Sequence, residues 1–369
     1  MKTAEWPEVK LGDICEFKYG KSLPAAERAP GPAPVYGSNG PVGTHDRYLT
    51  YGPTIVVGRK GSFGEISYAA GGCWPIDTTY YIDSSATSVD LRWLYYRLGG
   101  LGFKELNRAA AIPGLNRDDA YSKRLLLPPP EEQRRIAQVL DQANELRANR
   151  RQAITLLDDL AQSIFLEMFG PDSHYSLLPL GAVLNFVTSG GRGWAKYYAP
   201  SGSRFIRSLD VRMNHISSRD AVYVKAPDNA EARRTRVAAG DVLLTITGSL
   251  IGRVSAAGQE HDGSYISQHV AILRPNPGEL DPHFLAFYLS LPSGGQRQIR
   301  KMQYGQTKPG LNFDQIRAFE IPKVPIKEQR KFVAVLREVQ GQVLQMQGQL
   351  LRLDECYASL EAHAFHGRL

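Results

Sequence analysis

Two long segments of the chain carry apolar residues at the spacing of an amphipathic helix that packs along one seam. In the second segment, residues 326–369, the pattern repeats every seven residues without a break. All ten seam positions are apolar: Phe332, Leu336, Val339, Val343, Met346, Leu350, Leu353, Tyr357, Leu360 and Ala364. A sustained heptad pattern of this kind predicts a long helix in a coiled coil.

The first segment, residues 131–170, keeps the same register but is interrupted by Arg147 and Arg150. We expect the two seams to make the coiled-coil and partner contacts through Ile136, Leu140, Ile154, Leu157, Ile164, Phe332, Leu336, Val339, Val343, Leu350, Leu353 and Leu360. Helices that only pack on the preceding domains would be an alternative. An α-helix rises about 1.5 Å per residue, so a helix of roughly 38 residues would be about 57 Å long. This length favours a coiled-coil strut over helices that pack on the preceding domains.

The segments that precede these helices alternate between strand and helix patterns. Strand-like runs occupy residues 53–57, 79–82, 241–246 and 269–273, and short helices fit residues 91–98 and 282–289. Asn312 followed by Gln315 predicts a helix N-cap with a capping box. Prolines then end each run and open the long helix. The predicted fold class is α+β, with segments 1–130, 131–170, 171–325 and 326–369.

The chain contains an internal repeat of two copies. The tetrapeptide Pro-Gly-Leu-Asn at 113–116 recurs at 309–312, and Glu-Gln-Arg at 132–134 recurs at 328–330, without a change of offset. Matches further upstream are separated by fewer residues than these two. The differences in length between the copies therefore fall in the front of each copy, the part that precedes the long helix. A duplicated chain suits a nearly twofold ligand such as duplex DNA. Variable loops on a constant scaffold usually do the recognising.

Charge and composition narrow the class of partner. The chain of 369 residues has a formal net charge of +7, and residues 171–325 hold 18 Lys and Arg against 12 Asp and Glu. This balance favours a polyanion. Three cysteines without C-x-x-C spacing argue against disulfides and a structural zinc site, and no apolar run reaches membrane-spanning length. We expect a cytoplasmic protein without a membrane contact, a metal or a cofactor.

Catalytic motifs are missing from the sequence. A methyltransferase that acts on adenine would need a D/N-P-P-Y/F segment and a glycine-rich loop for the methyl donor, and neither is present. The sequence also lacks a phosphate-binding G-x-x-x-x-G-K-S/T loop and an H-E-x-x-H site. We therefore expect no enzyme activity. Two alternatives stay open: an assembly scaffold without DNA readout, and a nuclease or modification enzyme with an unrecognised site.

Several short segments occur in a fixed order in the two copies. They are Leu11-Gly12-Asp13-Ile14, Tyr36-Gly37-Ser38-Asn39-Gly40, Gly58-Arg59-Lys60-Gly61-Ser62, Ile266-Ser267-Gln268-His269, the two Pro-Gly-Leu-Asn segments and Pro129-Pro130-Glu131-Glu132-Gln133-Arg134. In this order the chain resembles the specificity subunit of type I restriction-modification systems, over essentially its whole length.

The resemblance implies a function and a set of partners. Each front would be a target recognition domain that reads one half of a split double-stranded DNA sequence. Two long antiparallel coiled-coil helices would set the gap between the halves, in a pseudo-twofold frame. Two methyltransferase (modification) subunits that methylate adenine N6 would dock on this frame, with restriction or translocase subunits as further partners. S-adenosylmethionine and ATP would belong to those partners.

Candidate DNA contacts come from polar loops at corresponding places in the two copies. Arg59 and Lys60 lie in a glycine-flanked turn, where backbone can approach a phosphate and arginine can reach a guanine edge. The full set of candidates is Tyr36, Ser38, Asn39, Arg59, Lys60, Ser62, Arg108, Arg207, Ser208, Thr247, Ser249, Lys301, Gln303, Tyr304, Gln306, Thr307 and Lys308. The basic cluster Arg233, Arg234 and Arg236 fits phosphate positioning or a solvated edge equally well.

Overall fold

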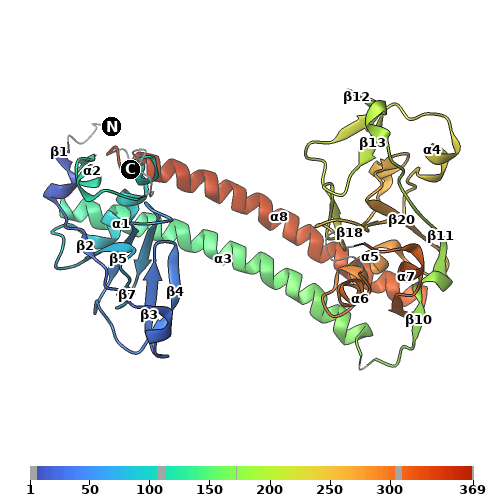
Figure 1. The fold of residues 1–369 in the computed structure, drawn as a ribbon, viewed down its shortest axis with the longest axis horizontal. Coiled ribbons are helices and arrows are strands. Elements are labelled where there is room, and N and C mark those ends of the chain that lie inside the picture. The colour runs from blue at the N-terminus through green and yellow to red at the C-terminus, as the bar shows by residue number, and fades with distance from the viewer. Residues whose placement is uncertain (1–5, 107–113, 172, 304–309, 368–369) are drawn as a thin grey trace. The chain divides into compact units, whose positions relative to one another are not determined.

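The computed structural model describes residues 6–106, 114–171, 173–303 and 310–367. The chain divides into two compact units, Met1–Ala153 with Met346–Leu369 (unit 1) and Ile154–Gln345 (unit 2). Two long helices, α3 (Pro130–Phe169) and α8 (Ile326–Ala364), each contribute residues to both units (Figure 1). Among the described residues, no helix is long and apolar enough to cross a membrane.

Unit 1 is built on small sheets in which neighbouring strands are antiparallel, except for the parallel pair of the second sheet. The main sheet has the order β2 (Lys18–Tyr19), β8 (Thr79–Asp83), β5 (Thr54–Gly58) and β6 (Ile66–Ala69). A second sheet has the order β4 (Gly40–His45), β3 (Ala33–Gly37) and β7 (Trp74–Pro75), and β1 (Glu8–Lys10) pairs with β9 (Arg124–Leu126). The helices are α1 (Leu91–Gly99) and α2 (Arg117–Tyr121), with 3-10 turns η1 (Leu11–Asp13), η2 (Ala25–Glu27) and η3 (Phe103–Glu105).

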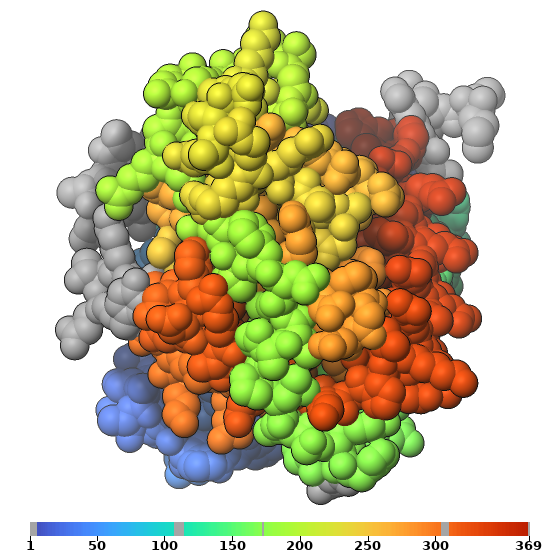
Figure 2. Space-filling model, turned by 90° about the vertical axis from the view of Figure 1, so that its right-hand side faces the viewer, coloured from blue at the N-terminus to red at the C-terminus, as the bar shows by residue number. Residues whose placement is uncertain are grey.

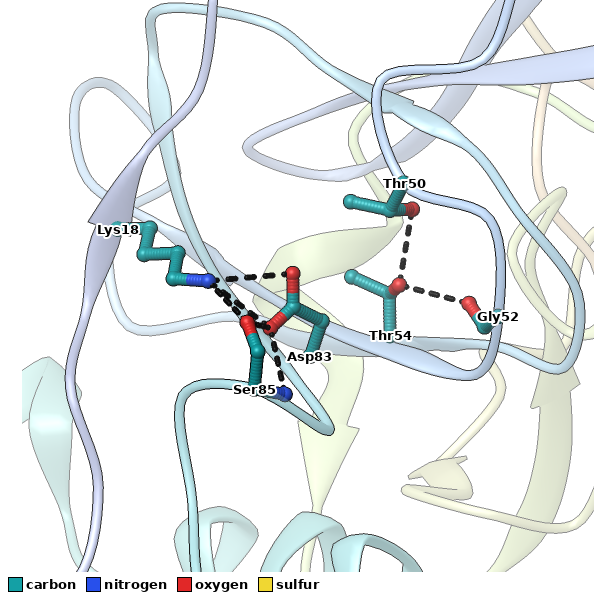
Figure 3. Close-up of polar contacts among 6 residues, drawn as sticks. All are labelled: Lys18, Thr50, Gly52, Thr54, Asp83 and Ser85. Atoms are coloured by element: carbon teal, nitrogen blue, oxygen red, sulfur yellow. Dashed lines mark hydrogen bonds and ion pairs between the residues drawn. The ribbon is translucent and has the colours of Figure 1, made fainter.

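Two polar clusters lie at one end of the main sheet of unit 1, where Thr54 of β5 pairs with Asp83 of β8 (Figure 3). Lys18 on β2 reaches Asp83 at the end of β8, with its Nζ 3.1 Å from Oδ1, and Ser85 donates its backbone N–H to the same oxygen at 3.0 Å. On β5, the Thr54 hydroxyl donates to the Thr50 hydroxyl, and its oxygen lies 2.9 Å from the Gly52 carbonyl oxygen. These contacts fix the edge strand and the entry to the central strand.

Unit 2 repeats this plan. Its main sheet has the order β11 (Leu184–Ser189), β20 (Val270–Pro275), β17 (Val242–Thr245) and β18 (Val254–Ala256), and β10 (Leu177–Pro179) pairs with β21 (Glu320–Pro322). The second sheet has the order β12 (Tyr198–Ala199), β16 (Val222–Val224), β13 (Ser203–Ile206) and β19 (Tyr265–Ile266). The helices α5 (Pro282–Ser290) and α7 (Phe313–Arg317), with the turn η4 (Leu180–Val183), correspond to α1, α2 and η1.

Unit 2 also contains elements for which the described part of unit 1 offers no match of equal length. These are the hairpin β14 (Val211–Arg212) and β15 (His215–Ile216), the helices α4 (Ala230–Arg234) and α6 (Gly295–Met302), and the turns η5 (Trp194–Tyr197) and η6 (Gln259–His261). Figure 1 shows β12, β13 and α4 at one end of unit 2 and α5, α6 and α7 around the start of α8 at the other. In Figure 2 the yellow-green segment projects beyond the orange and red helices. The insertions account for the rising offset between the copies.

Local signals in the sequence place these elements. The four strands and two short helices expected from residue patterns are confirmed as β5, β8, β17, β20, α1 and α5. Asn312 caps α7 and forms the expected capping box with Gln315, and Asn116 caps α2. Asp90 and Asp281 cap α1 and α5 by accepting backbone N–H groups of the first turn. The predicted α+β class is confirmed.

The end of each long helix completes the core of the unit that it reaches. Phe165 and Phe169, near the end of α3, pack with Phe284 and Phe332 in unit 2, where the Phe165 and Phe332 ring centroids are 5.1 Å apart. In unit 1, Ala364 and Phe365 of the α8 end join Ile136 and Leu140 of α3 in the buried core. The start of one helix therefore packs with the end of the other in each unit, so the helices run antiparallel.

Candidate functional site

One edge of unit 1 gathers three segments that are far apart in the sequence around the carbonyl oxygen of Thr78. This oxygen accepts the Ser38 hydroxyl at 2.7 Å and the backbone N–H groups of Arg59 and Lys60 at 2.9 and 3.1 Å. The Arg59 carbonyl in turn accepts the Leu115 backbone N–H at 2.9 Å. The β3–β4 turn, the loop after β5 and the Gly-Leu-Asn segment therefore meet at one place.

Several candidate residues present their side chains to solvent at this edge. Asn39, Lys60 and Ser62 are exposed. Lys60 pairs with Gly114 in an isolated bridge through its backbone, which leaves the ammonium group free of that contact. Tyr36 is only 9% exposed and packs in a buried cluster with Val56 and Cys73. The polar turn of the first copy therefore offers Asn39, Lys60 and Ser62 to a ligand, while Tyr36 supports the turn from below.

Arg59 is held inside the unit by aromatic and backbone partners. Its guanidinium carbon lies 5.3 and 5.7 Å from the ring centroids of Tyr19 and Tyr80, and one Nη donates to the Asp77 carbonyl at 2.5 Å. Burial raises the pKa of Tyr80 to about 12, so the phenol stays neutral beside the guanidinium. Arg59 thus orders the loop that carries Lys60.

Unit 2 has the same edge with different side chains. The His269 carbonyl accepts the Ile246 N–H at 2.9 Å, the Ile246 carbonyl accepts the Leu311 N–H at 2.9 Å, and Thr247 pairs with Gly310. These contacts repeat those of Thr78, Arg59 and Lys60. The Thr247 hydroxyl lies 2.5 Å from Nδ1 of His269, and Ser249 is exposed beyond it. The same backbone frame thus carries hydroxyl and imidazole groups in unit 2 where unit 1 carries cations.

The other candidates of unit 2 differ in how far they are engaged. Arg207 forms a bidentate pair with Asp210, at 2.9 and 3.0 Å, and also donates to the Asp220 carbonyl; Ser208 beside it is half-buried. In the basic cluster, Arg233 pairs with Asp228 and Arg234 donates to Thr188 and Ser189. Lys301 is exposed and Gln303 half-buried at the end of α6. Five candidates lie outside the described residues: Arg108, Tyr304, Gln306, Thr307 and Lys308.

Three residues at these edges were absent from the sequence-based list of candidates. His269 and Gln268 follow β19, and the Gln268 Nε2 lies 3.1 Å from Nε2 of His269. Asp77 is the residue that corresponds to Gln268 in unit 1, and it is exposed. The internal repeat is the signal that could have found them. β7 and β19 occupy equivalent places, because each pairs in parallel with β3 or β13, so the residues that follow β7 and β19 also correspond.

The seam residues of the long helices divide by depth. Ile136, Leu140, Phe332, Leu336 and Val339 are buried in the cores of the two units. The remaining seam candidates are half-buried: Ile154, Leu157, Ile164, Val343, Leu350, Leu353 and Leu360. At the break in the seam, Arg147 donates to Asp354 at 2.5 Å and lies 4.3 Å from the Tyr357 ring centroid. The interruption is therefore a polar contact between the two helices.

Outside the seam, large apolar side chains of both helices are exposed. Leu146 and Leu351 in unit 1 are 57% and 61% exposed, and Leu156 and Leu344 in unit 2 are 58% and 70% exposed. These four leucines are candidate contacts for a protein partner. No group of three or more His, Cys, Asp or Glu that could hold a metal ion occurs in the part of the chain that the structure describes.

Comparison with known proteins agrees with this duplicated architecture. The family model described as "Type I restriction modification DNA specificity domain" matches residues 3–156 and 212–352. No curated protein sequence matches the chain significantly. A crystal structure of the S subunit of a type I restriction-modification system from M. genitalium matches with a TM-score of 0.66 and 16% identity, covering 99% of this chain and 98% of that one. A structure described as the basis of complex assembly and conformational transition of the type I R-M system matches with a TM-score of 0.60 and 19% identity over 100% of both chains.

Proposed function

Because this chain belongs to the type I restriction-modification DNA specificity family, we propose that each unit reads one half of a bipartite duplex target through the edge around Thr78 or His269. The family is one of DNA specificity, so the chain supplies recognition and no catalysis of its own. The observation that carries the proposal is one backbone frame, repeated in both units, with different side chains: the exposed Lys60 and Ser62 in unit 1, and the half-buried Thr247 and exposed Ser249 in unit 2.

Different side chains on one frame suit two different half-sites. A lysine ammonium donates to guanine O6 and N7 or to a phosphate, whereas a hydroxyl can donate or accept at either base of a pair. Asn39 adds an amide, which pairs well with adenine N6 and N7. We expect the bases of the two half-sites to differ accordingly.

Partner docking is the second part of the proposal. Two methyltransferase subunits would cover the exposed leucines of α3 and α8, one at each unit, and restriction subunits would join through them. Apolar side chains that are more than half exposed, such as Leu156 and Leu344, are the main support. Replacing Leu344 with Gln should leave the melting temperature unchanged and weaken methyltransferase binding; Gln342→Ala, at an exposed position two residues away, is the matched control.

Methylation mapping tests the reading function. The chain is expressed with its cognate methyltransferase in a host without its own system, and modified adenines are mapped. Exchange of residues 1–125 for the corresponding segment of a relative should change one half of the target and keep the other. A change in both halves together would contradict one reader per unit. If the chain were a scaffold without DNA readout, binding of duplex DNA by the chain itself, measured at two salt concentrations, would show no steep salt dependence.

A further inference from the structure

The two units differ in charge at one equivalent position. This position lies beside the edge around Thr78 or His269 that is proposed to read DNA, called the reading edge below. In unit 1 the Gly58 N–H donates to the Glu65 carbonyl at 2.8 Å, and in unit 2 the Thr245 N–H donates to the Arg253 carbonyl at 2.8 Å. The preceding glycines also match, since Gly64 and Gly252 donate back to the first residue of each pair. Glu65 and Arg253 therefore occupy the same place, at the end of the loop that carries Lys60 or Thr247.

In unit 1 this position is neutralised. Glu65 accepts an ion pair from Lys104, with Oε1 and Nζ 2.6 Å apart, and Lys104 lies in η3. Gly64 permits the approach, because a Cβ there would lie 2.9 Å from the backbone nitrogen of Lys104. The pair leaves no net charge beside the loop.

In unit 2 the basic helix α6 takes the place of η3. The Gln296 amide donates to the Gly252 carbonyl at 2.8 Å, and a Cβ on Gly252 would lie 3.0 Å from Gln296 Oε1. The α6 sequence contains Arg297, Arg300 and Lys301 and no acidic residue, and all three cations are exposed. No carboxylate is therefore supplied by α6 to balance Arg253.

Arg253 has no counter-charge among the residues that the structure describes. Its guanidinium makes no ion pair and no hydrogen bond with them, and its Nη1 is buried without a partner. Burial lowers the pKa of Arg253, and the positive charge of Arg212 lowers it further. Arg212 is exposed and also has no ion pair in the described part of the chain. Two neighbouring arginines without a carboxylate form a site that an anion would stabilise.

The hairpin that carries Arg212 is an insertion at the reading edge. In unit 1, Ser38 and Asn39 alone connect β3 to β4, whereas residues 207–221 connect the corresponding β13 and β16. Asn214 fixes the inserted hairpin: its N–H donates to the Val254 carbonyl at 2.8 Å and its amide to the Ser290 hydroxyl at 2.8 Å. Arg212 is therefore held beside the strand that begins after Arg253.

We propose that Arg253 and Arg212 bind one backbone phosphate of the DNA beside the Thr247–Ser249 loop, and that unit 1 makes no equivalent contact. This inference rests on the proposed function. Guanidinium groups suit phosphate oxygens, and contacts of this kind position the duplex without reading its sequence. The half-site of unit 2 is then anchored by charge more strongly than that of unit 1, in line with 18 Lys and Arg against 12 Asp and Glu in residues 171–325 and 15 against 13 in residues 1–130.

The test is the salt dependence of DNA binding by the complete complex with its methyltransferase. The double variant Arg212→Gln, Arg253→Gln should bind cognate and non-cognate DNA more weakly by the same factor. The slope of log K against log salt should become shallower by about 0.9, the value for one phosphate. Arg219→Gln, at a side chain 90% exposed in the same unit, should leave the slope unchanged, as should the paired variant Glu65→Gln, Lys104→Gln in unit 1.

A neutral methylphosphonate placed at single positions of the DNA identifies the source of the anion. One position in the half-site of unit 2 should weaken binding by the wild type and have no further effect on the double variant. The proposal is overturned if the double variant keeps the wild-type slope of log K against log salt. It is also overturned if no single neutral linkage reproduces the loss of DNA affinity seen in the double variant. A wild-type complex without salt-dependent binding would instead refute the DNA-reading function itself. Arg212→Gln alone, at an exposed site, keeps the test valid if Arg253→Gln impairs folding.

Discussion

The side-chain carbonyl of Gln329 accepts the backbone N–H of Asp281 at 2.8 Å, and its amide donates to the carbonyl groups of Glu279 and Val324 at 2.8 Å. Gln133 makes the corresponding bonds with Asp90 and Pro128 in unit 1. The glutamine of the repeated Glu-Gln-Arg motif thus ties the first turn of a long helix to the N-cap of a short one.

Gln329→Ala should therefore destabilise unit 2. Gln329 is 2% exposed, so its removal leaves buried backbone groups without partners, at a cost of about 1–3 kcal/mol. Denaturant unfolding of the variant should show a lower midpoint. Gln342→Ala, on the exposed face of the same helix, is the control and should leave the midpoint unchanged. Equal midpoints for the two variants would mean that the bridge contributes nothing.

The charge pair in Figure 3 should make unit 1 sensitive to acid. Burial acts to raise the pKa of Asp83, but hydrogen bonds from Ser85 and Lys18 and the charge of Lys18 outweigh it and hold the pKa below the ordinary value of an aspartate. A lowered folded-state pKa stabilises the protein at a pH above the unfolded-state value, and that stability is lost as pH falls through the folded-state pKa. Asp83→Asn should lower the melting temperature at pH 7 more than at pH 3. A difference independent of pH would contradict the ion pair.

Arg59 and Lys60 are adjacent, yet they should respond differently to replacement by alanine. Arg59→Ala removes two cation–π contacts of about 0.5–1 kcal/mol each and a backbone hydrogen bond, so it should lower the melting temperature. Lys60→Ala removes an exposed ammonium, so it should weaken DNA binding at an unchanged melting temperature. Binding titrations and thermal unfolding of both variants separate the two roles, and a destabilised Lys60→Ala would argue against them.

The difference between these two residues marks the limit of the sequence. Glycine spacing identifies a turn at residues 58–62, but it does not indicate that Tyr19 and Tyr80 flank Arg59. The repeat likewise singled out Gln133 without its partner Asp90, and the heptads showed an interruption at Arg147 without Asp354. Periodicity and capping residues act within a few positions, so α1, α5, β5 and β20 could be predicted. Contacts between segments that are distant in the sequence depend on the tertiary fold, so they could not be predicted from the sequence.

The long helices offer the sharpest test of the proposal that each unit reads one half-site at a fixed spacing. Within unit 1, Arg147 contacts Asp354, and within unit 2, Phe165 contacts Phe332, so an insertion in one helix alone would break one of these registers. A paired variant has seven residues inserted in each helix, after Ala153 in α3 and after Gln345 in α8. It should keep both contacts, because an insertion of seven residues preserves the heptad pattern. Each insertion adds about 10 Å of helix, or roughly three base pairs at 3.4 Å per pair. Methylation mapping of the paired variant should show unchanged half-sites and a longer spacer. Altered bases at an unchanged spacing would show that the helices do not set the gap.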